Sequence, residues 1–154
     1  MTDDEVYAAL QTAIQNLRSE EPHLDFAGVH ERSTAHRLAV HMEPLFTPEW
    51  NVDCEYDRDR NVRKALDGIR ACDDQRRTDN ILPDIIVHRR RESGRDNNLL
   101  VIELKRHADY DRFDWMKLQL MTQPNGDYAY QLGLHFNIAN GTFEQTWFRD
   151  GEVR

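Results

Sequence analysis

Hydrophobic and polar residues alternate along this chain with two different periods. Apolar side chains spaced three and four residues apart predict three amphipathic helices. The first covers residues 3 to about 20. The second starts just after Gly28 and is closed by Pro44 and Pro48, and the third runs from Asp109 or Asp111 to about Gln123. Thr2 or Asp3 is expected to cap the first helix, because a short polar side chain accepts a hydrogen bond from a helix's first turn.

A period of two predicts β-strands elsewhere in the chain. The expected strands cover residues 49–57, 81–88, 99–105, 128–139 and 143–149. Asn140 and Gly141 suit a tight hairpin turn between the last two of them. Residues 58–80 are polar and irregular, and we expect one short helix within them.

The strands over Ile81–His88 and Leu99–Lys105 form a hairpin, since the Gly and Asn residues between them suit a chain reversal. Side chains alternate between the two faces of a strand, so Asp84 on one strand and Glu103 and Lys105 on the other share a face. The opposite face is wholly apolar and consists of Ile85, Val87, Leu100, Ile102 and Leu104. Two carboxylates and an ammonium group would be costly to bury without partners, so such a cluster normally binds a metal or does chemistry.

Composition limits the class of protein. A chain of 154 residues, 39% hydrophobic and 31% charged, suits a single soluble domain over residues 1–154. No apolar run approaches the roughly 20 residues of a membrane span, and the acidic N-terminus is unlike a signal peptide. We therefore expect a cytoplasmic protein with no membrane partner. Cys54 and Cys72 lack the close spacing of a zinc site and are expected to be reduced.

The net charge of -8 argues mildly against broad attraction to a polyanion. Arginines nevertheless cluster within residues 58–77 and 89–95. They are candidates for phosphate contact; alternatively, they are solvated and offset by neighbouring aspartates.

Pro83-Asp84, followed across the hairpin by Glu103-Leu104-Lys105, resembles the motif of the PD-(D/E)XK nuclease superfamily. The order helix, strand, hairpin, helix, strand also resembles the α-β-β-β-α-β core of that superfamily. The resemblance implies an α/β, restriction-endonuclease-like fold over about residues 28–139, with a mixed central sheet flanked by helices and an extra N-terminal helix. It further implies that Glu31, on the helix before the sheet, joins the site; alternatively, Glu31 is a first-turn glutamate favoured by the helix dipole.

The function that the resemblance implies is hydrolysis of phosphodiester bonds in nucleic acid, DNA in preference to RNA, with Mg²⁺ or Mn²⁺ as cofactor. Asp84, Glu103, Glu31 and the carbonyl of Leu104 would hold the ion, because these cations prefer hard oxygen ligands. Lys105 would lower the pKa of the attacking water and hold it against the phosphate.

Related nucleases often place a basic or amide residue beside the scissile phosphate from the following helix, which makes Lys117 and Gln119 candidates. The alternative for Lys117 is an ordinary solvated lysine. Two other interpretations of the chain stay open. One is a catalytically inactive relative that acts as a binding module or docks on a larger protein partner, whereas a homodimer would suit a nuclease that cuts both DNA strands. In the other, Glu103 and Lys105 form an ordinary ion pair and Asp84 caps a turn.

Overall fold

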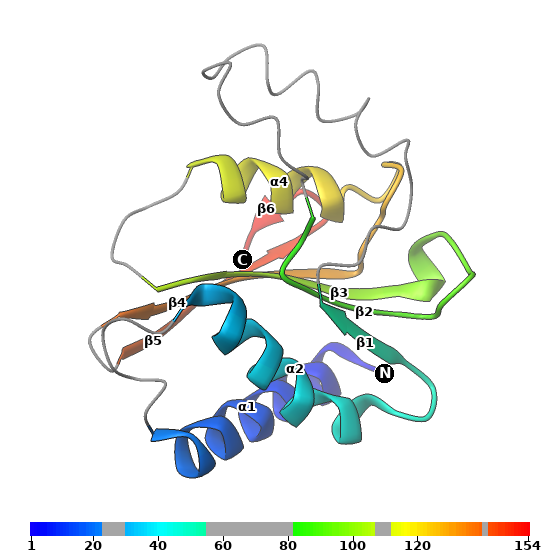
Figure 1. The fold of residues 1–154 in the computed structure, drawn as a ribbon. Coiled ribbons are helices and arrows are strands. Elements are labelled where there is room, and N and C mark those ends of the chain that lie inside the picture. The colour runs from blue at the N-terminus through cyan, green and yellow to red at the C-terminus, as the bar shows by residue number, and fades with distance from the viewer. Residues whose placement is uncertain (23–29, 55–81, 107–111, 140–141) are drawn as a thin grey trace.

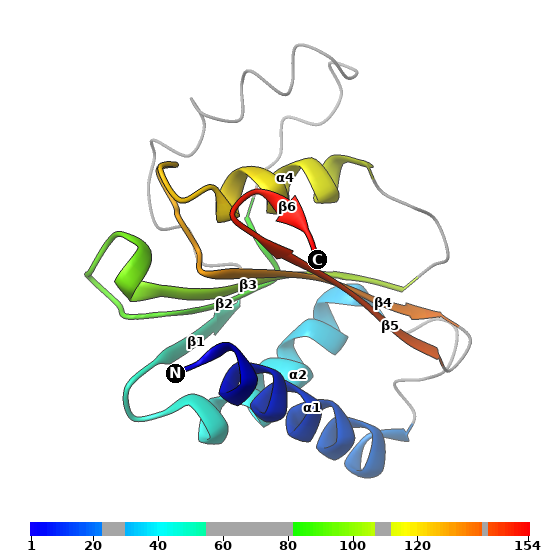
Figure 2. The same ribbon diagram turned by 180° about the vertical axis from the view of Figure 1, so that it is seen from behind.

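The computed structural model describes residues 1–22, 30–54, 82–106, 112–139 and 142–154. It has one six-stranded mixed sheet with helices on both faces (Figure 1). Helices α1 (Asp3–Glu20) and α2 (Glu31–Phe46) cover one face. Helix α4 (Arg112–Thr122) covers the other face, as the view from behind also shows (Figure 2). The predicted α/β class is therefore confirmed.

A capping box marks the start of α1, and α2 continues past the proline that was expected to end it. In α1, the Thr2 hydroxyl accepts a hydrogen bond from the Glu5 N–H at 3.3 Å, and the Glu5 carboxylate accepts one from the Thr2 N–H at 2.7 Å. Pro44 lies inside α2 instead of closing it as predicted, and the helix ends at Phe46. Val40, whose carbonyl a residue at position 44 would normally bond, is 39% exposed, so water can replace the bond that proline cannot make.

The strands follow one another across the sheet in chain order. They are β1 (Asn51–Cys54), β2 (Ile85–His88), β3 (Asn98–Lys105), β4 (Leu132–Ala139), β5 (Thr142–Arg149) and β6 (Glu152–Val153). β3 and β4 run parallel, and the other neighbouring strands pair antiparallel. Parallel neighbours need a crossover connection, and α4 lies on it (Figure 1). The short strand β6 is not among the predicted strands.

The predicted central hairpin is present, with the predicted alternation of faces. β2 and β3 pair antiparallel, with Ile85 opposite Ile102 and Ile86 opposite Val101. The first pair packs in the core beneath α1 and α2, and the second packs in a smaller core beneath α4. Because Glu103 shares its face with Val101, the charged face of the hairpin is directed toward α4.

Residues 128–131, predicted to begin a strand, lie before β4. The Tyr130 N–H donates to the carbonyl of Met121 at 2.8 Å, and both side chains are buried in the core beneath α4. Ala129 has a φ of 46°, which is incompatible with an extended strand. The alternating aromatic residues therefore return the chain from α4 to the sheet instead of lengthening the strand.

Gly133 of β4 lies close beneath α4, and we expect Gly133→Ala to lower the free energy of unfolding by about 1–3 kcal/mol through overpacking. A Cβ at this position would lie 2.9 Å from Thr122 Cγ2 and 3.2 Å from Phe148 Cβ. Urea unfolding measures the loss.

The control adds Thr122→Ser to Gly133→Ala. Serine removes the methyl group but keeps the hydroxyl, which donates to the Leu118 carbonyl at 2.8 Å. Part of the lost stability should return. If none does, crowding by Thr122 is not the cause of the destabilisation.

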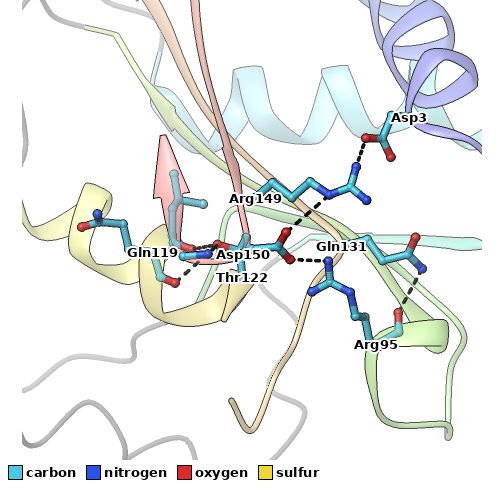
Figure 3. Close-up of polar contacts among 9 residues, drawn as sticks. Asp3, Arg95, Gln119, Thr122, Gln131, Arg149 and Asp150 are labelled. Atoms are coloured by element: carbon cyan, nitrogen blue, oxygen red, sulfur yellow. Dashed lines mark hydrogen bonds and ion pairs between the residues drawn. The ribbon is translucent and has the colours of Figure 1, made fainter. Parts of the chain in front are cut away.

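A polar network connects the turn between β5 and β6 to distant parts of the chain (Figure 3). Arg149 forms an ion pair with Asp3 at the start of α1, and its Nε lies 3.8 Å from Asp150 Oδ2. Asp150 Oδ1 in turn lies 2.6 Å from Arg95 Nη2, on the short 3₁₀ helix that precedes β3. Such partly exposed ion pairs contribute little stability each, so the network adds only weakly to the packing of the C-terminal strands.

Some of the predicted features lie outside the described residues. They are the short helix and the arginines within 58–77, Cys72, the turn at Asn140 and Gly141, and the caps at Asp109 and Asp111. None of the helices in the described part of the chain is long and apolar enough to cross a membrane.

Candidate active site

Charged side chains from separate elements gather where β3 ends. Glu103 and Lys105 extend from the last residues of β3, Asp84 immediately precedes β2, and Glu31 is the first residue of α2. Contacts connect them: Lys105 Nζ lies 3.4 Å from Glu31 Oε1, and the Leu104 N–H donates to Asp84 Oδ2 at 2.7 Å. The fold therefore brings together Asp84, Glu103, Lys105 and Glu31, four of the six side chains predicted for the site, and burial together with the Asp84 charge raises the pKa of both glutamates.

Glu103 is the most deeply buried of these groups, at 2% exposure. Its Oε2 lies 2.7 Å from Nζ of Lys117 on α4, which is itself 5% exposed. Burial raises the pKa of Glu103 to about 8, because the effect of Lys117 does not fully offset the lost hydration and the nearby carboxylate of Asp84. Burial alone would lower the pKa of Lys117, but Glu103 and Asp114 outweigh it and raise that pKa, so Lys117 stays charged.

Lys105 lies between two carboxylates. Its Nζ is 2.9 Å from Asp114 Oδ2 and 3.4 Å from Glu31 Oε1, and its side chain remains 25% exposed. Burial raises the pKa of Glu31, with Lys105 acting in the opposite direction and Asp84 in the same direction. Lys105 is thus an ammonium group held at the cluster yet open to solvent.

Asp84 is half-buried, and burial is the main cause that raises its pKa. The hydrogen bond from the Leu104 backbone and the charges of Lys117 and Lys105 act against that rise. A carboxylate that accepts a hydrogen bond from the backbone of β3 is fixed beside that strand. Asp84 is therefore positioned by the hairpin itself, across the antiparallel pairing of β2 and β3.

Two residues of α4 complete the cluster. Asp114 was not among the predicted site residues, yet it is 4% exposed and its Oδ1 lies 3.7 Å from Lys117 Nζ. The solvated alternative for Lys117 is wrong, because this lysine is buried against Glu103. Spacing contained a signal for the pair: residues three apart on a helix share a face, so Asp114 and Lys117 point the same way.

Gln119 is not brought to the cluster. It lies two residues after Lys117, which is about 200° around the helix at 3.6 residues per turn. Its carbonyl accepts a 3.3 Å hydrogen bond from the Thr122 hydroxyl, beside the turn between β5 and β6 (Figure 3).

Comparison with known proteins does not assign the chain to a family. No family model matches the sequence, and neither a curated protein nor a solved structure matches it. What the cluster can do chemically therefore rests on its own residues.

The donor chemistry of the cluster fits a divalent cation. Asp84, Glu103 and Glu31 are hard oxygen donors, and Asp84 lies within electrostatic reach of each of the two glutamates. Glu103 Oε1 is buried and accepts no hydrogen bond from the described residues. As arranged, however, no three His, Cys, Asp or Glu side chains in the described ranges converge closely enough to hold an ion. Coordination would require the carboxylates to turn from their present protein partners.

A hollow opens beside Asp84 toward α2. It is lined by Arg32, Ala35, His36, Cys54 and Asp84. The first three of these residues lie on one face of α2, at spacings of three and four. The hollow thus places an arginine and a histidine next to a predicted site carboxylate.

Proposed function

We propose that this protein is a metal-dependent nuclease that hydrolyses phosphodiester bonds of nucleic acid, with a restriction-endonuclease-like fold. The observation that carries the proposal is the gathering of Asp84, Glu103, Lys105 and Glu31 at the end of β3, with Glu103 buried and its pKa raised to about 8. The element order α2, β1, β2, β3, α4, β4 supports the fold, since it follows the α-β-β-β-α-β order that the sequence motif implies. Strongly perturbed carboxylates beside an ammonium group are typical of functional sites.

The residues divide the work of hydrolysis between them. A phosphodiester is already anionic and gains charge in the transition state, so the site must supply positive charge and an activated water. Asp84, Glu103, Glu31 and the Leu104 carbonyl would hold Mg²⁺ or Mn²⁺, which would supply both. Lys105, 25% exposed, would hold the attacking water against the phosphate. Lys117 would keep Glu103 in place when that carboxylate is ionised.

The hollow beside Asp84 gives the substrate an approach. Arg32 and His36 line it, and a guanidinium group is well suited to bind phosphate oxygens in pairs. A nucleic-acid strand that enters this hollow would place a phosphate next to Asp84. The proposal therefore assigns the backbone of the nucleic acid, DNA in preference to RNA, to the side of the cluster that faces α2.

The decisive experiment is cleavage of labelled single-stranded DNA, double-stranded DNA and RNA in Mg²⁺, Mn²⁺ and EDTA. We expect cleavage that requires the divalent ion and that Asp84→Asn abolishes, because an amide is a weaker ligand and carries no charge. Asp96→Asn makes the same chemical change at an exposed position in the same hairpin and should leave the rate unchanged. If no substrate is cut in either ion, or if Asp84→Asn cuts normally, the proposal is wrong.

A second function, an inactive binding module of the same fold, is favoured by a different observation. Glu103 is already paired with Lys117, and Asp84 already accepts the Leu104 N–H, so both carboxylates have protein partners. Titration calorimetry with Mn²⁺ separates the two functions. Heat of binding that Glu103→Gln removes supports the nuclease, whereas no heat and no cleavage support the binding module.

A further inference from the structure

Asp114 is a buried carboxylate located between two lysines from different elements. Its residue exposure is 4%; Oδ2 lies 2.9 Å from Nζ of Lys105 on β3, and Oδ1 lies 3.7 Å from Nζ of Lys117 on α4 itself. The contact with Lys105 has the distance of an ion pair without the alignment of a hydrogen bond. Asp114 thus bridges the strand that carries the predicted site and the helix that covers it.

The contacts of Asp114 with Lys105 and with Lys117 differ in how much they restrict each lysine side chain. Lys117 has a nearer carboxylate partner in Glu103, at 2.7 Å, and is itself buried. Lys105 is 25% exposed, and Glu31, another carboxylate near it, lies 3.4 Å away with a side chain 34% exposed. A long lysine side chain with an exposed partner keeps much of its rotamer freedom. Asp114 is buried, so it is the described carboxylate that holds the Lys105 ammonium near α4, at the buried end of the cluster.

We propose that Asp114 is a positioning residue that holds the Lys105 ammonium in the place where it acts on the attacking water. This inference rests on the proposed nuclease function and extends it to a residue outside the sequence motif. Asp114 itself touches neither substrate nor ion; it acts through Lys105. Misplacing a catalytic group by about 1 Å can cost on the order of 100-fold in rate, so a neutral residue at 114 should slow the chemical step.

A structural role is the competing explanation. Asp114 lies in the first turn of α4, where a carboxylate stabilises a helix through the dipole. That stabilisation does not depend on Lys105. A double-mutant cycle therefore separates the roles, because residues that act as a pair show non-additive effects and independent residues do not.

The first test needs neither metal nor substrate. Urea unfolding in EDTA compares wild type with Asp114→Asn, Lys105→Met and the double variant. We expect the double variant to lose less stability than the two single variants lose in sum, because the second change removes a partner that has already lost its pair. Asp127→Asn, an exposed carboxylate beyond α4, should combine additively with Lys105→Met. Additive shifts for Asp114→Asn would overturn the inference.

The second test uses saturating DNA and Mg²⁺. We expect Asp114→Asn to lower kcat by about 10- to 100-fold with little change in KM, and to have no further effect in the Lys105→Met background. Asp114→Glu, which keeps the charge, should restore part of kcat. If wild type cuts and Asp114→Asn cuts equally well, the positioning role is wrong and the nuclease stands. If wild type cuts nothing, the nuclease is wrong and the positioning role falls with it.

Discussion

Replacing Lys105 with methionine is expected to lower the single-turnover rate of DNA cleavage by at least about 100-fold, because loss of a preorganised charge at a reacting phosphate typically costs 10²–10³. The fold should survive the change. Lys105 is 25% exposed, and the carboxylate that it leaves behind, Asp114, keeps Lys117 at 3.7 Å. Methionine preserves most of the apolar length of lysine and removes only the ammonium group.

Single-turnover assays with enzyme in excess measure this effect, because they report the chemical step apart from product release. Arg106→Met is the matched control. Arg106 is the next cation along the chain, and its Nη1 donates to the Thr34 hydroxyl of α2 at 2.9 Å. A loss confined to Lys105→Met supports a specific catalytic role. Equal losses in both variants would mean that the rate depends on positive charge in this region in general and that Lys105 has no specific role.

The sequence determined much of this site because β-strands alternate strictly. Once the hairpin was recognised, Glu103 and Lys105 had to share a face, and the register of Ile86 with Val101 directs that face toward α4. The capping box at Thr2 likewise fixed the start of α1. These features depend on residues close in the sequence or on the pairing of two strands. The period of the hydrophobic pattern and the turn residues were therefore enough to predict them.

The residues that α4 contributes to the site could not be predicted from strand alternation and turn chemistry. Apolar residues were expected to mark the buried face of this helix. Leu118 and Met121 are buried as expected, but Phe113, Met116 and Leu120 are only half-buried, whereas Asp114 and Lys117 are buried. The helix packs over a strand face that carries Glu103 beside apolar residues, so its inward face must supply a cation as well as hydrocarbon. The complementary charge on β3 therefore helps decide which residues of α4 meet the sheet, and a helix pattern considered alone does not contain that information.

Lys117→Met is expected to destabilise the ion-free protein in a pH-dependent way. Burial raises the pKa of Glu103 to about 8 from 4.5, so between these values the folded protein holds a proton that the unfolded chain has released. The free energy of unfolding therefore falls as the pH rises through that interval. With Lys117 in place, an ionised Glu103 still has a cation at 2.7 Å; without Lys117, it has lost that cation.

At about pH 6, where Glu103 is protonated in the folded protein, Lys117→Met should change the free energy of unfolding little. At about pH 9 it should lower that free energy by about 1.4 kcal/mol more than at pH 6, because Glu103, with a pKa of about 8 beside Lys117, is ionised over only one pH unit of that range. Urea unfolding in EDTA at both pH values measures the difference. Glu103→Gln added to Lys117→Met removes the ionising group and should abolish most of the pH dependence. A loss that is equal at both pH values would show that Lys117 stabilises the core by packing and that its charge is not needed to compensate Glu103.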